Sequence, residues 1–194
     1  MTDALLFVIL HLFWVPVNLN CLNNKPMTTE QVEQALFFYC EHVKNIVVNR
    51  VQPRYKFLQF EADFISITKS GYASGFEIKI SRGDFRKDLK KAHFKAVLEN
   101  KQKGLERYYY RYKYFYYVVP EKLIPLAEEL LPEEFGIVAI VYHEKFDRVS
   151  FRNHRVGKKL FNHKWSLEDL LHLAHLGCMI LHRSVNHKVQ NIKL

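Results

Sequence analysis

Two short segments in which polar and apolar residues alternate, 60–67 and 76–81, constrain this chain more than any other feature. Both are rich in β-branched and aromatic residues, which are typical of β-strands. The segment between them, 68–75, contains two glycines and two serines and reads as a turn. The sequence therefore predicts a β-hairpin with a loop somewhat longer than the tightest types.

Charged residues occur inside these otherwise apolar strands. Side chains two residues apart on a strand point to the same face, so Glu61 and Asp63 share a face, and so do Glu77 and Lys79. If the strands pair in the simplest register, these side chains converge on one patch of the sheet. Acids within apolar strands are rare unless they are paired or bind a metal, so this patch is the candidate functional site.

The spacing of these residues resembles the D…(D/E)-x-K signature of the PD-(D/E)XK nuclease superfamily. Asp63 corresponds to the first acid, and Glu77-Ile78-Lys79 corresponds to the second acid and the lysine. The run that follows, residues 80–88, is similar to that of the MmcB-like group of DNA-repair-associated nucleases. Ala62 stands where the signature usually has proline. The resemblance extends over residues 28–142.

This resemblance implies a restriction-endonuclease-like core, in which helices flank a central mixed β-sheet in the order αβββαβ. The order of the expected elements also fits an α/β fold with a mixed sheet. The implied activity is metal-dependent hydrolysis of phosphodiester bonds in DNA, in repair, recombination or phage/host DNA processing. A non-catalytic nucleic-acid-binding protein that retains the nuclease fold is the alternative.

The resemblance also assigns roles to individual residues. Asp63, Glu77 and the backbone carbonyl of Ile78 would bind Mg²⁺ or Mn²⁺, hard cations that prefer oxygen ligands. Lys79 would complete the catalytic set with the two acids. A further ligand is expected from Glu61 or from Glu33 on the first helix, although a solvated surface glutamate is an equally good interpretation of Glu33.

Basic residues favour a polyanionic partner, which we expect to be DNA. The net charge is +9 and the sequence pI is about 9.4. Ser81 and Asp84 have the spacing of a helix cap and predict one helix with an apolar stripe from Phe85 to Ala96. Its basic face would contact phosphates, although such a face is often merely solvated. The predicted nucleic-acid contacts are Ser81, Arg82, Arg86, Lys87, Lys90, Lys91, Arg111 and Lys113.

A tyrosine-rich segment spans residues 108–117. Its later part, 114–119, has the β propensity of a buried strand. Arginine and lysine are interleaved with the tyrosines in the earlier part, a composition that permits base stacking and backbone contacts. We therefore assign residues 103–111 to possible nucleic-acid contact and residues 114–119 to the core.

The remaining elements follow from capping, apolar periodicity and turn residues. A capping box near Thr28 predicts a helix whose buried stripe runs from Val32 to Val43. Further elements are expected as strands at 46–51, 135–141 and 149–151, and as helices at 123–131 and from Ser166 onward.

The length favours one domain, at residues 28–187, with a hydrophobic extension at 1–27 and a tail at 188–194. The apolar run at 4–15 is shorter than the roughly 20 residues that a spanning helix needs, and no basic cluster precedes it. We expect an appended segment without a catalytic role and no stable membrane association; a membrane-attached interaction protein is the minority alternative.

Three widely spaced cysteines fit a reducing compartment, so the expected location is cytoplasmic. A homodimer is left open.

Overall fold

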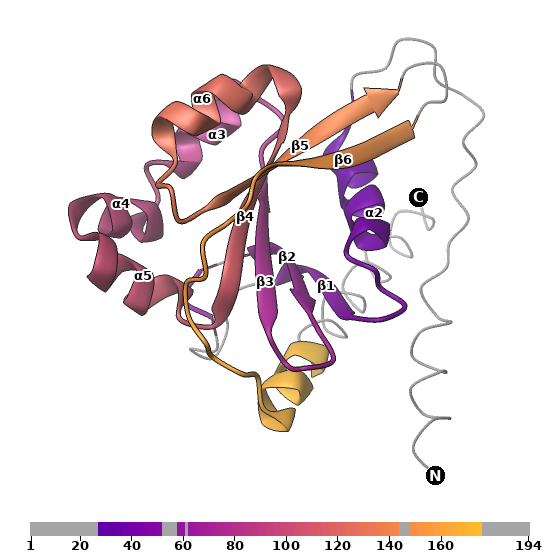
Figure 1. Ribbon diagram of the computed structural model, residues 1–194, viewed down its shortest axis with the longest axis vertical. Helices are drawn as coiled ribbons and strands as arrows, with labels where there is room; N and C mark the ends of the chain where they lie inside the picture. The colour runs from indigo at the N-terminus through magenta and orange to yellow at the C-terminus, as the bar shows by residue number, and fades with distance from the viewer. Residues whose placement is uncertain (1–26, 52–57, 61, 144–147, 176–194) are drawn as a thin grey trace, which may run out of the picture.

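The computed structural model describes residues 27–51, 58–60, 62–143 and 148–175. These residues form a six-stranded β-sheet with helices on both faces (Figure 1). The predicted α/β class and mixed sheet are confirmed. None of the helices in the described part of the chain is long and apolar enough to cross a membrane.

The strands lie in the sheet in the order in which they occur along the chain. They are β1 (Ile46–Val51), β2 (Ala62–Ile67), β3 (Ala73–Ile78), β4 (Tyr112–Pro120), β5 (Gly136–His143) and β6 (Arg148–Arg155). β1, β2 and β3 are antiparallel neighbours, β3, β4 and β5 run parallel, and β6 is antiparallel to β5. β2 and β3 are the predicted hairpin, and Gly71 in its turn has a φ of 83°, which glycine adopts without steric cost.

The first described helix, α2 (Thr29–Tyr39), begins at the predicted capping box. The Thr28 hydroxyl accepts a hydrogen bond from the Gln31 N–H, and the Gln31 side chain accepts one from the Thr28 N–H. Its buried residues are Val32 and Leu36. The helix ends before Val43, so the predicted stripe is wrong at that position, where the side chain is 78% exposed.

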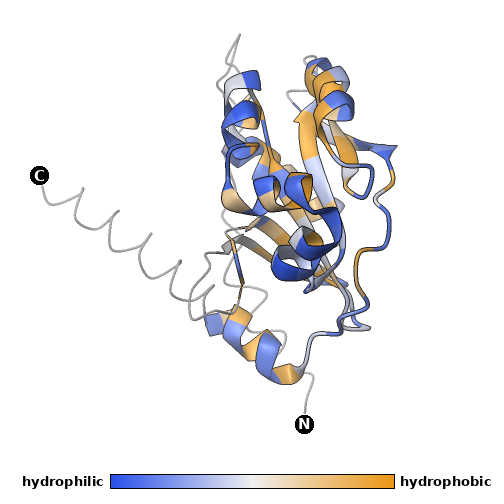
Figure 2. Cartoon of the chain, turned by 90° about the vertical axis from the view of Figure 1, so that its left-hand side faces the viewer, coloured by the Kyte–Doolittle hydropathy of each residue, from blue (hydrophilic) through white to orange (hydrophobic). Residues whose placement is uncertain are grey.

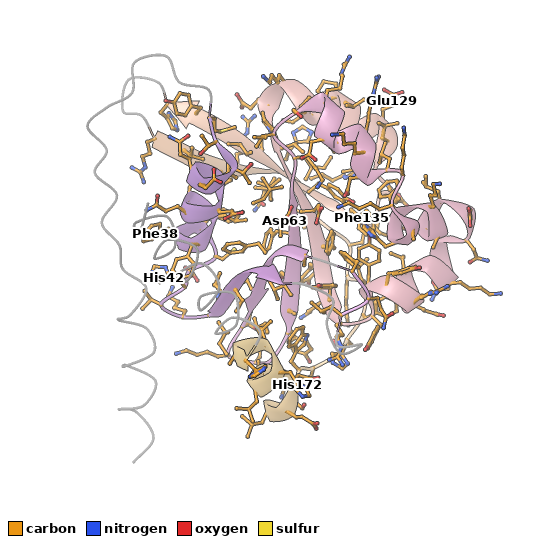
Figure 3. All side chains as sticks on the ribbon, turned by 180° about the vertical axis from the view of Figure 1, so that it is seen from behind. Phe38, His42, Asp63, Glu129, Phe135 and His172 are labelled. Atoms are coloured by element: carbon orange, nitrogen blue, oxygen red, sulfur yellow. The ribbon has the colours of Figure 1, made fainter. Side chains whose placement is uncertain are left out.

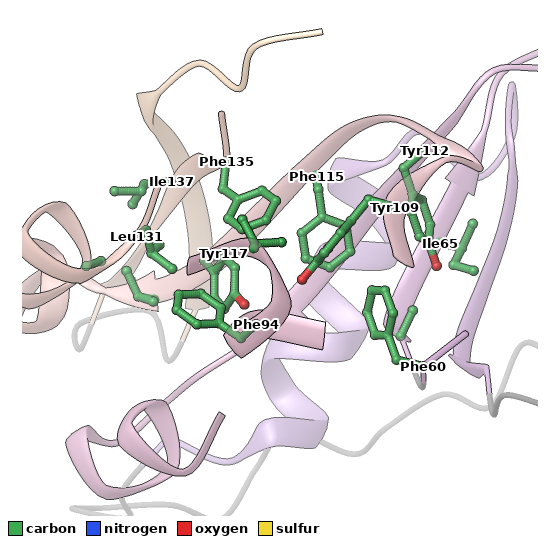
Figure 4. Close-up of a cluster of buried hydrophobic side chains, with 14 of the residues drawn as sticks. Phe60, Ile65, Phe94, Tyr109, Tyr112, Phe115, Tyr117, Leu131, Phe135 and Ile137 are labelled. Carbon is green, nitrogen blue, oxygen red and sulfur yellow. The ribbon is translucent and has the colours of Figure 1, made fainter. Parts of the chain in front are cut away.

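Two hydrophobic clusters cover opposite faces of the sheet. The cluster on the α2 face contains Val32, Leu36, Cys40, Phe64, Phe76, Ile78, Val118, Val138 and Ile140. The other cluster is larger and rich in aromatic rings (Figure 4). Its rings include Phe60, Phe85, Phe94, Tyr109, Tyr112, Phe115, Tyr117 and Phe135. Three of them, Phe115, Tyr117 and Phe135, lie 5.6 to 6.0 Å from one another between ring centroids.

The single helix predicted after β3 is instead two short helices, α3 (Arg82–Asp88) and α4 (Ala92–Glu99). The predicted cap of α3 is present, because the Asp84 N–H donates to the Ser81 hydroxyl over 3.2 Å. α3 and α4 are separated by three residues, of which Lys91 has the extended backbone of an N-cap. The periodicity of apolar residues runs through this break and therefore did not reveal it.

The tyrosine-rich segment ends α5 (Lys101–Tyr109) and begins β4. Tyr109 and Tyr112 are fully buried in the aromatic cluster, so Tyr109 belongs to the core and its assignment to nucleic-acid contact is wrong. The predicted core assignment of residues 114–119 holds for Phe115, Tyr117, Val118 and Val119, which are buried.

The elements after β4 agree closely with the expected ones. The short 3-10 helix η1 (Glu121–Leu123) leads into α6 (Ile124–Leu130) and then β5. β6 is longer than the predicted three residues. Residues 167–175 are helical, and the Asp169 N–H donates to the Ser166 hydroxyl at its start. Figure 2 shows hydrophilic and hydrophobic residues interleaved along the helices. This pattern is expected for helices that pack one face against a sheet and expose the other.

Candidate functional site

The hairpin register brings the motif residues together. Phe64 of β2 pairs with Phe76 of the antiparallel strand β3. Asp63, one residue before Phe64, therefore lies next to Glu77, one residue after Phe76. Lys79 follows the end of β3 and shares the Glu77 face. Figure 3 labels Asp63 toward the middle of the molecule, where the strands converge.

The Lys79 ammonium lies among three carboxylates. Its Nζ is 2.6 Å from Glu77 Oε1, 3.4 Å from Asp88 Oδ1 and 4.0 Å from Asp63 Oδ2. Asp63 Oδ2 also accepts a hydrogen bond from the Ile78 N–H over 2.8 Å. The Asp63 carboxylate is thereby fixed against the backbone between Glu77 and Lys79.

Asp88 and Lys91 also belong to this cluster, and sequence reasoning assigned neither to it. Asp88 is 1% exposed and accepts a hydrogen bond from the Tyr117 hydroxyl over 3.1 Å. Lys91 Nζ is 2.5 Å from Asp88 Oδ1 and 3.2 Å from Glu77 Oε1. Asp88 follows the buried Phe85 by three residues, and this spacing places both on the covered side of α3. That spacing is the signal that would have identified Asp88.

Burial and charge act against each other in this cluster. Burial, reinforced by the Asp63 charge, raises the pKa of Glu77 to about 8 despite the two lysines. Burial also raises the pKa of Asp63, which Lys79 and the Ile78 N–H oppose. At Asp88 burial is outweighed by Lys79 and Lys91, so its pKa is lowered.

The two lysines are held in their charged forms. Burial alone would lower the pKa of Lys79, but Glu77, Asp88 and Asp63 together raise it. The same balance raises the pKa of Lys91, with Glu77 and Asp88 as the opposing charges. Lys79 is therefore an ammonium at neutral pH.

The residues fit a magnesium-like ion in part. Within the described ranges, no group of three or more His, Cys, Asp or Glu side chains is arranged to hold a metal. Mg²⁺, however, commonly uses one or two carboxylates and keeps several waters. Asp63 and Glu77 supply two carboxylates, and Glu77 Oε2 is buried and accepts no hydrogen bond from the described residues.

The other expected ligands are not brought into the cluster. Glu33 lies on α2, whose buried residues pack on the opposite face of the sheet, and its role as a ligand stays a prediction. Glu61 lies outside the described residues, as do the predicted extension before residue 27 and the tail at 188–194.

The predicted nucleic-acid residues fall into two groups. Exposed residues on and next to α3 are Ser81, Arg82, Arg86, Lys87 and Lys90. The others already contact protein groups. Arg111 pairs with Asp169 over 2.6 Å, and Lys113 Nζ lies 4.3 Å from the centre of the Tyr72 ring. Lys91 belongs to the carboxylate cluster.

Comparison with known proteins adds information about the fold. No family model and no curated protein match the chain. The chain is similar to a solved structure described as a protein of unknown function from Silicibacter pomeroyi. The two share 17% sequence identity and superpose with a TM-score of 0.52, over 84% of this chain and 91% of the other. This similarity concerns the fold alone.

Proposed function

We propose that the protein is a Mg²⁺- or Mn²⁺-dependent deoxyribonuclease of the PD-(D/E)XK type. The observation that carries this proposal is the convergence of Asp63, Glu77 and Lys79 from two paired strands. Lys79 Nζ lies 2.6 Å from one of these carboxylates and 4.0 Å from the other. Two acids and one ammonium in such proximity suit a reaction in which negative charge develops on a phosphate.

The order of elements supports a restriction-endonuclease-like core. A helix, three antiparallel strands, a helical segment and a parallel strand follow one another as α2, β1 to β3, α3 to α5, and β4. This is the αβββαβ order that the resemblance implies. η1, α6, β5 and β6 extend it.

Asp63, Glu77 and the Ile78 carbonyl would hold the divalent ion. Bound there, the ion would polarise a phosphoryl oxygen and lower the pKa of an attacking water. Glu77 would have to lose its proton, because carboxylates bind metals in the ionised form. Asp63 is pre-positioned for this role, because its hydrogen bond to Ile78 fixes the carboxylate next to that residue.

In this proposal Lys79 stabilises negative charge with its ammonium group and does not act as a general base. Its pKa is raised by the surrounding carboxylates, so its ammonium is retained at neutral pH. It would donate a hydrogen bond to a phosphate oxygen or to the attacking water and stabilise the developing negative charge. Asp88, which lies 3.4 Å from Lys79 Nζ, holds that ammonium in place from the α3 side.

DNA would approach over α3. Arg86, Lys87 and Lys90 are exposed there and follow the site directly in sequence. Lysine and arginine side chains in such an arrangement contact the phosphate backbone without reading sequence.

A nucleic-acid-binding protein without turnover is the second candidate. Two lysines, Lys79 and Lys91, already contact Glu77 Oε1. Their charges would offset the carboxylates within the protein itself. This arrangement favours a static ion-pair cluster with a structural role.

A cleavage panel separates the two candidates. Single-stranded, duplex and branched DNA, with single-stranded RNA alongside, would be incubated with the protein in Mg²⁺, Mn²⁺ or Ca²⁺. We expect cleavage of at least one DNA in Mg²⁺ or Mn²⁺, and a loss of about 10²-fold or more in Asp63→Asn, because the variant lacks one of the charges that hold the ion.

Asp84→Asn is the matched control, since Asp84 is exposed on α3. This variant should cut at the parental rate. If the parent binds DNA but cuts no substrate in any metal, the binding protein without turnover is the correct function.

A further inference from the structure

Glu77 Oε1 is shared by two ammonium groups whose surroundings differ. Lys79 Nζ lies 2.6 Å away, and its side chain is 5% exposed. Lys91 Nζ lies 3.2 Å away, and its side chain is 48% exposed. Lys79 is enclosed by two further carboxylates, whereas Lys91 reaches the same oxygen from the surface.

Lys91 stands at a break in the helical segment. It is the N-cap of α4, three residues after the end of α3, and its Nζ contacts Asp88 Oδ1 as well as Glu77 Oε1. Arg86, Lys87 and Lys90 are exposed on the same short stretch of chain. Lys91 directly follows Lys90 in sequence, so nucleic acid bound over this stretch would pass close to its flexible, four-carbon side chain.

The second oxygen of Glu77 indicates that this carboxylate has a further ligand. The Glu77 side chain is 2% exposed, and its Oε2 is buried without a hydrogen-bond partner in the described part of the chain. A buried carboxylate oxygen without a partner is costly, and a bound ion or water is one way to satisfy it.

The charges of the cluster suit an exchange of cations. Once Glu77 has lost its proton, the carboxylates of Asp63, Glu77 and Asp88 carry three negative charges, which face the two positive charges of Lys79 and Lys91 and leave a net charge of −1. Departure of Lys91 would change this to −2, which a divalent cation would neutralise. If Lys79 departed instead, the cluster would also reach −2, but this ammonium is buried, so removing it from its carboxylates would cost more free energy.

We propose that Lys91 is a displaceable cation that couples nucleic-acid binding to divalent-metal binding. In the free protein its ammonium competes with the metal for Glu77. When a nucleic-acid phosphate is bound, Lys91 transfers to that phosphate, and Glu77 becomes available to the ion. This inference rests on the proposed function and adds a regulatory role for a residue outside the D…E-x-K set.

Mn²⁺ titration of the full chain, followed by calorimetry without DNA, tests the competition directly. Lys91→Met removes the charge and keeps the length of the side chain, and it should bind Mn²⁺ about tenfold more tightly or better, because one positive charge near the ion is lost. Lys95→Met is the matched control: Lys95 is an exposed lysine on α4, outside the carboxylate cluster and the predicted DNA contacts, and its loss should leave the affinity unchanged. Lys91→Arg retains the charge and should behave like the parent.

A second titration, with a phosphorothioate duplex that resists cleavage, tests the coupling. The duplex should tighten Mn²⁺ binding in the parent and in Lys95→Met by about 5- to 150-fold, the usual range of coupling between sites. Lys91→Met should show little further gain from the duplex, because its Glu77 is already available.

The outcomes distinguish this inference from the proposed function. If the parent binds no Mn²⁺, both are refuted. If the parent binds Mn²⁺ and Lys91→Met binds it equally or less tightly, the coupling is refuted and the nuclease proposal stands. If Lys91→Met does not fold, acetylation of the parent followed by mass spectrometry decides: Mn²⁺ without DNA should raise the reactivity of Lys91, because the ion displaces its ammonium from Glu77, and an unchanged reactivity refutes the coupling.

Discussion

At the scale of single residues, the cluster depends on the competition between burial and ion pairing. Glu77 is deeply buried and has a raised pKa, although Lys79 and Lys91 both contact it. The free energy lost when a carboxylate is removed from water exceeds the free energy gained from its attraction to these cations. The folded protein therefore retains a proton on Glu77 over a pH range in which the unfolded chain has lost it.

This retained proton predicts a pH-dependent stability. The pKa of Glu77 rises from an ordinary 4.5 to about 8 on folding, so the folded state holds more protons within that window and stability falls as pH rises through it. The buried His93 acts in the opposite sense, because burial lowers its pKa from 6.5 to about 4 and its contribution to stability grows with pH only up to about 6.5. The Glu77 contribution is therefore best observed between pH 6.5 and 8.

Glu77→Gln should flatten the fall in stability over that interval, because glutamine cannot ionise. The slope attributable to Glu77 approaches about 1.4 kcal/mol per pH unit, and urea unfolding at several pH values would measure it. Glu99→Gln, at an exposed position, is the control and should keep the parental slope. Parallel pH profiles for parent and Glu77→Gln would show that Glu77 is ionised throughout.

At the scale of elements, the helical segment between β3 and β4 forms one side of the site and packs tightly within itself. α4 and α5 approach each other at Gly104, where an added Cβ would lie 2.5 Å from backbone atoms of Ala96 and Val97. Such a distance requires the two helices to separate. The close packing at Gly104 thus fixes the position of α4 and of the break before it.

Gly104→Ala should lower the free energy of unfolding by about 1–3 kcal/mol, the usual cost of overpacking. Gly83→Ala is the matched control, because nothing lies within 4 Å of a Cβ added there. Alanine at this helical position should leave stability unchanged or raise it slightly. Thermal unfolding of both variants measures the difference, and equal melting temperatures would contradict the close packing.

The exposed face of α3 and its C-terminal end provide a second test at this scale. Replacing Arg86, Lys87 and Lys90 by alanine should weaken DNA binding and reduce the slope of log K against log salt by about 0.9 for each lost phosphate contact. Fluorescence anisotropy with a labelled duplex in Ca²⁺ measures both quantities.

A triple variant of Lys158, Lys159 and Lys164 is the control. The Lys158 N–H donates to the Glu134 carbonyl, just before β5 begins, and the N–H of Trp165, the residue after Lys164, donates to the Gly71 carbonyl, just before β3 begins. These lysines therefore lie near the beginnings of the strands, whereas Glu77 lies near the end of β3. An identical loss of affinity and slope in both triple variants would mean that DNA is bound by net charge alone.

At the scale of the whole molecule, local signals predicted most of the elements. Alternation along β2 and β3, the glycine in their turn and the capping residues Thr28 and Ser81 each act within a few residues of chain. They were sufficient to predict the hairpin, the α/β class and the meeting of Asp63, Glu77 and Lys79. The break between α3 and α4 and the burial of Tyr109 depend on packing between distant segments, which periodicity does not report.

The same limit explains why the cluster was only half predicted. Asp88 reaches Lys79, and Lys91 reaches Glu77, because α3 and the residues after it fold back over the end of β3. Their pattern in sequence is that of an ordinary amphipathic helix with a basic face. Only the tertiary arrangement distinguishes a solvated lysine such as Lys90 from one that pairs with buried acids.

The central claim is that Asp63, Glu77 and Lys79 form a nuclease centre in which Lys79 stabilises charge and binds no metal. The most direct measurement is the single-turnover cleavage rate of Lys79→Met in Mn²⁺, with Mn²⁺ affinity measured on the same preparation and Lys95→Met as an exposed control. We predict a rate lower by about 10²–10⁴-fold, together with an unchanged or tighter affinity for Mn²⁺, because a positive charge near the ion is removed. Cleavage by Lys79→Met at the parental rate would contradict the claim.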